Sequence, residues 1–107
     1  LYFWSSKSAD CQSINQSLLQ IYEKNKNNGF EVYAVALEDS KAEWMKMIKF
    51  EGLNWINVSE LSSLESKAAQ KFNVRSIPAS FLYNKEGEIV ARDIFGAELQ
   101  KWLDNLL

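Results

Sequence analysis

The chain has 107 residues, a formal net charge of −2, a single cysteine and no histidine. This length predicts one domain whose core needs no disulfide bonds, and a lone thiol cannot close an internal bridge. The lack of histidine excludes Ser-His-Asp and Cys-His catalytic arrangements and histidine-based zinc sites. Because the charge is near neutral and no apolar run approaches ~20 residues, we expect no nucleic-acid partner and no membrane contact by this domain itself.

The first third of the chain predicts a strand, a helix and a second strand. The aromatic run Leu1–Trp4 is strand-like and begins without a turn or cap, so we expect the 107 residues to be the C-terminal part of a longer protein. Apolar residues spaced by three and four predict a helix over residues 8–28, with Ser8 or Asp10 as its N-cap and Gly29 as its left-handed end. Residues 31–37 are apolar on both faces, which is typical of a central parallel strand. Together these elements predict a βαβ unit.

The rest of the chain predicts two more helices, a short strand, a hairpin and a last helix. Residues 40–43 form a capping box that opens a helix ending at Gly52. A further helix is expected to begin at Ser62 or Ser63, to bury Leu64 and to stop at Asn73. The other expected elements are a strand at 55–58, two antiparallel strands at 80–83 and 88–91, and a final helix from Ala97. This order predicts an α/β fold with a central mixed sheet flanked by helices.

Three stretches give this element order a family resemblance. Residues 3–11 (Phe-Trp-Ser-Ser-Lys-Ser-Ala-Asp-Cys) resemble the Phe-Trp-Ala-x-Trp-Cys-x-x-Cys segment of thiol-disulfide oxidoreductases of the TlpA/ResA type. Residues 76–82 (Ser-Ile-Pro-Ala-Ser-Phe-Leu) are similar to the proline segment of that family, and residues 84–90 are similar to its Asp-x-x-Gly-x-Ile hairpin. The resemblance implies a single thioredoxin-like domain over residues 1–107, with the extra central helix and strand of the TlpA/ResA branch.

The resemblance also places the reactive positions. Cys11 matches the second cysteine of Cys-x-x-Cys, Ser8 stands where the first, attacking cysteine would be, and Lys7 replaces the tryptophan before it. Ile14 and Gln16 stand where this branch commonly has a glutamate and a proline. Disulfide exchange needs a thiolate at the exposed start of a helix, and a serine hydroxyl without a neighbouring base cannot replace it. A dithiol cycle is therefore not expected within this chain.

A partner-binding groove is the second feature that the resemblance implies. Pro78 is the only proline, and the family implies a cis bond between Ile77 and Pro78 whose backbone pairs with bound peptide. The groove residues expected on this basis are Trp4, Lys7, Ala9, Asp10, Ile77 and Pro78. For Trp4 a core or half-buried position is the commoner outcome. The adjacent carboxylates Glu38 and Asp39 offer too few ligands for a metal, and we expect no metal and no cofactor.

Three hypotheses about function remain, and the residues favour the first of them. The first is a module that has lost dithiol activity and binds a peptide or protein partner beside Pro78. The second is a single-cysteine thiol redox protein that uses Cys11 in disulfide exchange, and the third is a peroxide-reacting thiol protein. If Cys11 is an inert, buried core residue, only the first hypothesis holds. For all of them the resemblance implies a protein or peptide partner with thiol or disulfide groups, and a periplasmic or cell-envelope location in a bacterium.

Overall fold

The computed structural model describes the backbone of residues 1–107 and the side chains of all of them except Leu64. Its strands are β1 (Tyr2–Trp4), β2 (Tyr33–Ala36), β3 (Ile56–Val58), β4 (Ala79–Tyr83) and β5 (Ile89–Arg92). They form one mixed sheet in the order β3-β2-β1-β4-β5, in which β1 is parallel to β2 and antiparallel to β4. The expected mixed sheet is confirmed, and β1 lies at its centre.

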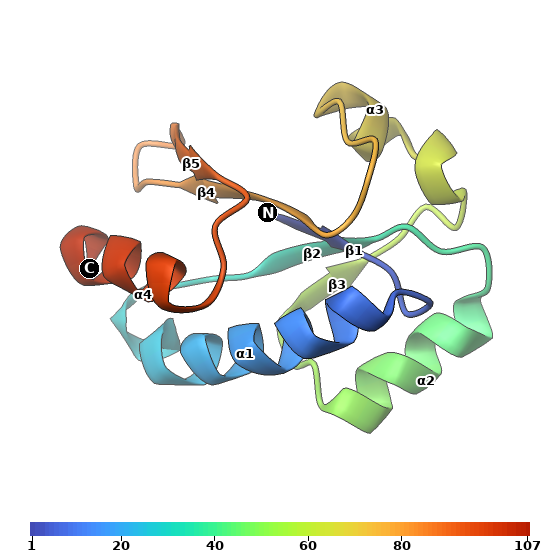
Figure 1. Ribbon diagram of the computed structural model, residues 1–107, viewed down its shortest axis with the longest axis horizontal. Helices are drawn as coiled ribbons and strands as arrows, with labels where there is room; N and C mark the ends of the chain where they lie inside the picture. The colour runs from blue at the N-terminus through green and yellow to red at the C-terminus, as the bar shows by residue number, and fades with distance from the viewer.

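Helices cover both faces of this sheet (Figure 1). They are α1 (Ala9–Asn25), α2 (Lys41–Glu51), α3 (Lys67–Lys71) and α4 (Gly96–Leu106), with 3-10 turns η1 (Lys26–Asn28) and η2 (Ser63–Glu65). Helices α1, α2 and α4 lie on one side of the sheet and α3 on the other (Figure 1). Within the described residues, no helix has the length and apolar character needed to cross a membrane.

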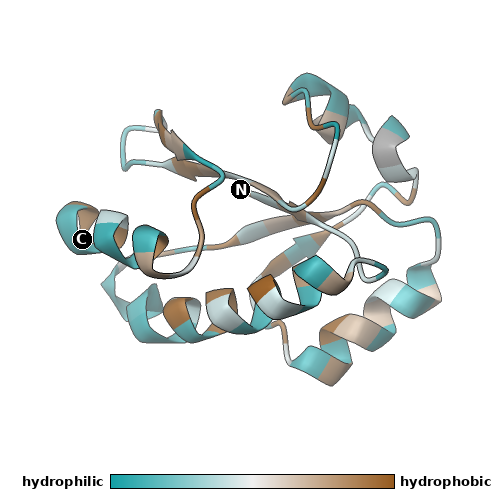
Figure 2. Cartoon of the chain, viewed as in Figure 1, coloured by the Kyte–Doolittle hydropathy of each residue, from teal (hydrophilic) through white to brown (hydrophobic). Residues whose placement is uncertain are grey.

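Strand β1 divides the core into two clusters. Successive side chains of a strand point to opposite faces, so Tyr2 and Trp4 pack with residues of α1, α2 and α4, whereas Phe3 packs with Ala69 of α3 and with Phe81. The rings of Phe3 and Phe81 meet edge to face at 6.1 Å between centroids. Hydrophobic residues recur between hydrophilic ones along α1 (Figure 2), in agreement with the expected amphipathic helix. Because β1 is packed on both faces, the loop that follows it starts from a fixed position.

Two helix ends follow the sequence signals closely. Helix α1 ends at Asn25 and continues as the turn η1, after which Gly29 adopts a φ of 100°. Helix α2 begins after Ser40, whose Oγ accepts a hydrogen bond from the Glu43 amide at 3.3 Å. These positions confirm the expected ends, because both residue types satisfy backbone groups or angles that a helix end requires.

The single helix expected between residues 62 and 72 is wrong, because the chain forms η2 and α3 as separate pieces. Ser66 has an extended backbone between them, and its Oγ accepts a hydrogen bond from the Ala69 amide at 3.3 Å. The Glu60 carboxylate accepts bonds from the Ser66 hydroxyl and from the amides of Lys67 and Ala68, the last two at 3.0 and 3.1 Å. Glu60 and Ser66 together start α3 three or four residues later than predicted. The side chain of Leu64, expected on the buried face, lies outside the described residues.

Candidate functional site

The first turn of α1 holds the two positions at which the sequence places the redox motif. Ser8 is the N-cap, with an extended backbone (φ −94°, ψ 119°), and its Oγ accepts a hydrogen bond from the Cys11 amide at 3.3 Å. The backbone of Ser8 is also held in place, because its amide donates a hydrogen bond to the Ser5 carbonyl at 3.2 Å. The serine hydroxyl therefore has a structural task as the N-cap of α1.

Cys11 is a free cysteine that is fully buried, with 0% of its surface exposed. It belongs to the core cluster that contains Tyr2 and Trp4. A thiol in this environment behaves as a small hydrophobic group and has no direct contact with solvent. The arrangement thus separates the two ends of the motif: the hydroxyl of Ser8 is half-buried at the helix start, and the thiol of Cys11 points into the core.

A chain of polar side chains, buried at Tyr2 and Asn15 and half-buried at Glu51, lies beside the thiol, and sequence reasoning missed it. The Tyr2 hydroxyl donates to Asn15 Oδ1 at 2.7 Å, and Asn15 Nδ2 donates to Glu51 Oε2 at 3.1 Å. Burial raises the pKa of Tyr2, and the neighbouring Cys11 raises it further. Burial also raises the pKa of Glu51, against the opposing effect of its bond from Asn15. The available signal was the spacing of Asn15 four residues after Cys11, which puts both on the same face of α1.

A surface hollow of about 190 Å³ lies next to the proline loop. We call it the Ile77 hollow, and it is lined by Ser5, Lys7, Leu37, Asp39, Ser63, Ser76 and Ile77. The peptide bond between Ile77 and Pro78 is cis. The structure therefore brings together two of the expected groove residues, Lys7 and Ile77. Ala9 and Asp10 are exposed on the first turn of α1 but do not line this hollow.

Trp4 requires a correction to the expected groove. Its side chain is fully buried in the core, so it cannot line a surface that a partner touches. The reason is the central place of β1, whose two faces are both covered by helices or loops. Trp4 is instead a core aromatic, which is the other role that the sequence allowed.

The carboxylates of Glu38 and Asp39, which follow β2, have separate partners. Asp39 Oδ1 pairs with Lys7 Nζ at 2.7 Å on the surface, which raises the pKa of Lys7 and lowers that of Asp39 through their hydrogen bond. Glu38 is buried and accepts hydrogen bonds from the loop between β1 and α1. Among the side chains that the structure describes, no group of three or more Asp, Glu, Cys or His residues could hold a metal ion.

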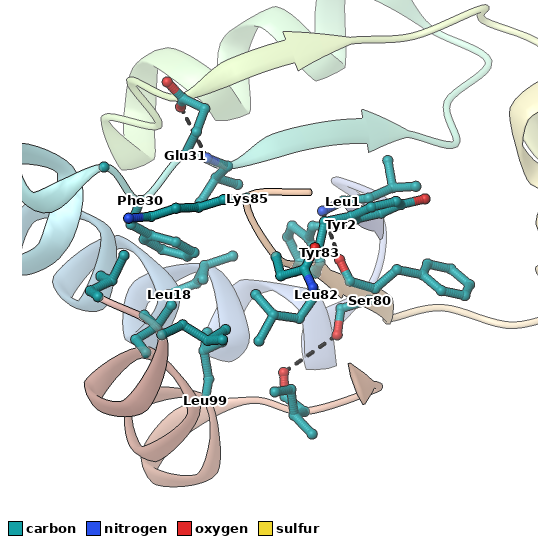
Figure 3. Close-up of a pocket in the computed structure, with 18 of the residues that line it drawn as sticks. Leu1, Tyr2, Leu18, Phe30, Glu31, Ser80, Leu82, Tyr83, Lys85 and Leu99 are labelled. Atoms are coloured by element: carbon teal, nitrogen blue, oxygen red, sulfur yellow. Dashed lines mark hydrogen bonds between the residues drawn. The ribbon is translucent and has the colours of Figure 1, made fainter. Parts of the chain in front are cut away.

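A larger cavity of about 480 Å³ opens near the beginning of β1, between the β4-β5 hairpin and α4 (Figure 3). Its walls include Leu18, Leu82 and Leu99. The backbone nitrogen of Leu1 donates to the Phe81 carbonyl at 3.0 Å there. In the described part of the chain, the residues lining this cavity include none of the predicted site residues. The Ile77 hollow, in contrast, is lined by two of them, Lys7 and Ile77.

Comparison with known proteins agrees with the geometry. The model of a family described as thioredoxin-like matches residues 1–89, and this chain belongs to that family. No curated protein matches the chain.

Two solved structures are particularly similar. One is the C-terminal domain of a Bacteroides thetaiotaomicron protein described as a thiol-disulfide oxidoreductase, with 31% identity and a TM-score of 0.90 over 98% of this chain and 73% of that one. The other is a thiol-disulfide oxidoreductase from Bacteroides fragilis, with 29% identity and a TM-score of 0.90 over 99% of this chain and 78% of that one. StoA from Bacillus subtilis, at 21% identity, shares the fold over 96% of this chain and 77% of its own, with a TM-score of 0.77.

Proposed function

We propose that this chain is a member of the thiol-disulfide oxidoreductase family that lacks dithiol redox activity and binds a protein or peptide partner at the Ile77 hollow. One observation carries the proposal: the helix start that should present a sulfur nucleophile presents the Ser8 hydroxyl, which caps the helix by accepting from the Cys11 amide. The single thiol lies behind it, buried in the core.

The chemistry of exchange explains why this arrangement argues against turnover. A thiolate must attack the substrate disulfide, and a second thiol must then release the mixed disulfide. The helix N-terminus would favour a thiolate at residue 8, but a hydroxyl there stays protonated at neutral pH without a base. Cys11 has no exposed surface from which to attack a protein disulfide. Neither step has its reactant in this chain.

The partner-binding part of the proposal rests on the surface beside the cis-proline. The Ile77 hollow combines an apolar floor from Leu37 and Ile77 with a rim that carries the Lys7 and Asp39 charges. An extended peptide binds such a site by pairing with exposed backbone while its side chains enter neighbouring pockets. We further propose that the domain belongs to a longer protein of the bacterial cell envelope, because TlpA/ResA-type domains are placed there.

The test of activity is reduction of insulin disulfides by dithiothreitol, with and without the protein. We expect no acceleration by the wild-type chain. The matched variant is Ser8→Cys, in which residues 8 and 11 form a disulfide and turnover appears, because the first turn of α1 puts both sulfurs on one face. Turnover by the wild type comparable to that of Ser8→Cys would overturn the proposal.

Labelling of the native thiol distinguishes the remaining alternatives. We expect a thiol reagent to modify Cys11 slowly in the folded protein and rapidly in urea, since only opening of the structure exposes the sulfur. Rapid native labelling would support single-cysteine redox or peroxide chemistry instead. Partner binding is measured by NMR as changes in the amide shifts of Ser76 and Ile77 on titration with an extended cysteine-containing peptide. Shifts confined to the larger cavity would contradict the assigned surface.

A further inference from the structure

The loop between β1 and α1 is held by two consecutive acidic residues at the end of β2. We call residues 5–7 the site loop, because they connect β1 to the Ser8 cap. The Glu38 carboxylate accepts hydrogen bonds from Ser5 Oγ at 3.0 Å, from the Ser6 amide at 3.1 Å and from the Ser6 hydroxyl. Asp39 pairs with Lys7 on the surface. Every residue of the site loop is thus bound to this pair.

Glu38 is the more consequential of the two because it is buried, with 2% of its surface exposed. Neither ion pair found among the described side chains, Lys7 with Asp39 and Lys26 with Glu23, includes Glu38. A buried carboxylate is costly unless hydrogen-bond donors surround it. The side-chain and backbone donors that satisfy Glu38 are neutral groups of Ser5 and Ser6. The carboxylate and the site loop therefore depend on one another.

Hydrogen bonds of Ser5 and Ser8 connect this carboxylate, residue by residue, to the backbone of Cys11. The Ser5 hydroxyl, which donates to Glu38, also accepts from the Lys7 amide at 3.2 Å. The Ser5 carbonyl accepts from the Ser8 amide at 3.2 Å, and the Ser8 hydroxyl accepts from the Cys11 amide at 3.3 Å. The Glu38 carbonyl accepts from the Ser63 amide at 3.1 Å, which links the same residue to a further wall of the Ile77 hollow.

We propose that Glu38 is the positioning residue of the candidate site: its buried carboxylate fixes the site loop, so that Ser8 caps α1 over a protected Cys11 and Ser5 and Lys7 form a wall of the Ile77 hollow. The proposal deepens the proposed function and rests on it for the role of the hollow. A fixed loop lowers the ordering cost of binding a partner there. In the sequence, the Glu38-Asp39 pair is only a weak candidate for binding a metal. The contacts indicate instead that Glu38 holds the site loop in place.

The test compares Glu38→Gln with the wild type by the rate at which a thiol reagent labels Cys11 in the folded protein. The amide of glutamine keeps the shape of the side chain but replaces one of its two acceptor oxygens with an NH₂ donor that faces the donors of the site loop, so the loop loses one of its two acceptor atoms. Unfolding alone would raise the labelling rate in proportion to the unfolded fraction. We expect Glu38→Gln to be labelled at least ten times faster than that proportional rate. The unfolded fraction comes from urea denaturation of the same variant.

Matched variants separate positioning from general destabilisation. Leu99→Ala weakens the core at α4, away from the site loop, and we expect its labelling to rise only in proportion to its unfolded fraction. Asp39→Asn removes the exposed partner of Lys7, and we expect less than a twofold change in labelling. Ser6→Ala removes one donor to Glu38 and should raise labelling in the same direction, by a smaller factor. It also keeps the proposal testable if Glu38→Gln does not fold.

Equal labelling of Glu38→Gln and Leu99→Ala at equal unfolded fraction would overturn the positioning role. Amide exchange gives a second reading, in which Glu38→Gln accelerates exchange at Ser6, Ser8 and Cys11 but not at Val35 in β2. This outcome does not depend on the proposed function. If the wild type reduced insulin, the proposed function would fail while the comparison of variants still decided the role of Glu38.

Discussion

The hydrogen bond from the Cys11 amide to Ser8 Oγ gives a quantitative prediction about the role of Ser8. Replacing Ser8 with alanine removes the acceptor and leaves a backbone N–H at the start of α1 without its partner. Loss of an N-cap side chain costs about 0.5–2 kcal/mol. The bond is 3.3 Å long and Ser8 is half-buried, so water can replace part of the interaction. We therefore expect a loss in the lower half of that range, about 0.5–1 kcal/mol.

The chain contains a matched control for this substitution. Ser40 caps α2 with the same geometry, since its Oγ accepts from the Glu43 amide, also at 3.3 Å. Ser40→Ala should therefore cost about as much as Ser8→Ala, about 0.5–1 kcal/mol. Ser8→Asp, which keeps an oxygen acceptor and adds a charge that the helix N-terminus favours, should remain within about 0.5 kcal/mol of the wild type.

Urea denaturation measures these differences. With an m-value of about 1–3 kcal/mol per M, a loss of 0.5–1 kcal/mol lowers the midpoint by roughly 0.2–1 M. The N-cap role of Ser8 is refuted if Ser8→Ala is as stable as the wild type while Ser40→Ala is destabilised. That result would mean that Ser8 does not hold the helix start and is kept at this position for another purpose.

Three further predictions concern residues around the site. Cys11→Ala should cost about 1 kcal/mol of unfolding free energy, and Cys11→Ser about 2 kcal/mol, because a hydroxyl is harder to bury than a thiol; equal denaturation midpoints would contradict the burial of Cys11. Tyr2→Phe leaves Asn15 Oδ1 without its donor in the core, and we expect a loss of about 1–3 kcal/mol, measured by thermal unfolding. The bonds from Ser66 and the α3 amides lower the pKa of Glu60, so the stabilisation is complete above its ordinary pKa of 4.5 and is lost as the pH falls through the lowered value. NMR titration of the Ala68 amide should therefore give a midpoint below 4.5 in the wild type, and no transition in Glu60→Gln.

The features of the fold that depend on local sequence were predictable. The helix caps at Ser8 and Ser40, the left-handed Gly29 and the helix end at Gly52 follow from neighbouring residues alone. The βαβ unit followed from the spacing of apolar residues, and the hairpin followed from its turn. The break at Ser66 was not predictable in this way, because it depends on a carboxylate six residues earlier that competes for the amides of the expected helix.

The site was predictable only where the family motif covers it. The motif singled out Ser8 and Cys11 at the start of α1, and the proline loop that the resemblance also singled out lies near Lys7. It did not reveal Glu38, whose partners lie 32 and 33 residues earlier in the chain and meet it only once β1 and β2 pair. The burial of Trp4 also depends on the sheet order, which sets β1 between two covered faces.

Ile77 packs against both core clusters, the one that contains Tyr2 and Trp4 and the one that contains Phe3. It also lines the hollow proposed for a partner. A ligand that displaced this side chain by a fraction of an ångström would disturb the packing above and below the sheet at once, because close-packed interiors transmit small movements. Binding at the Ile77 hollow would then change the NMR shifts of methyl groups in the core on both faces of the sheet, such as those of Val35 and Leu103.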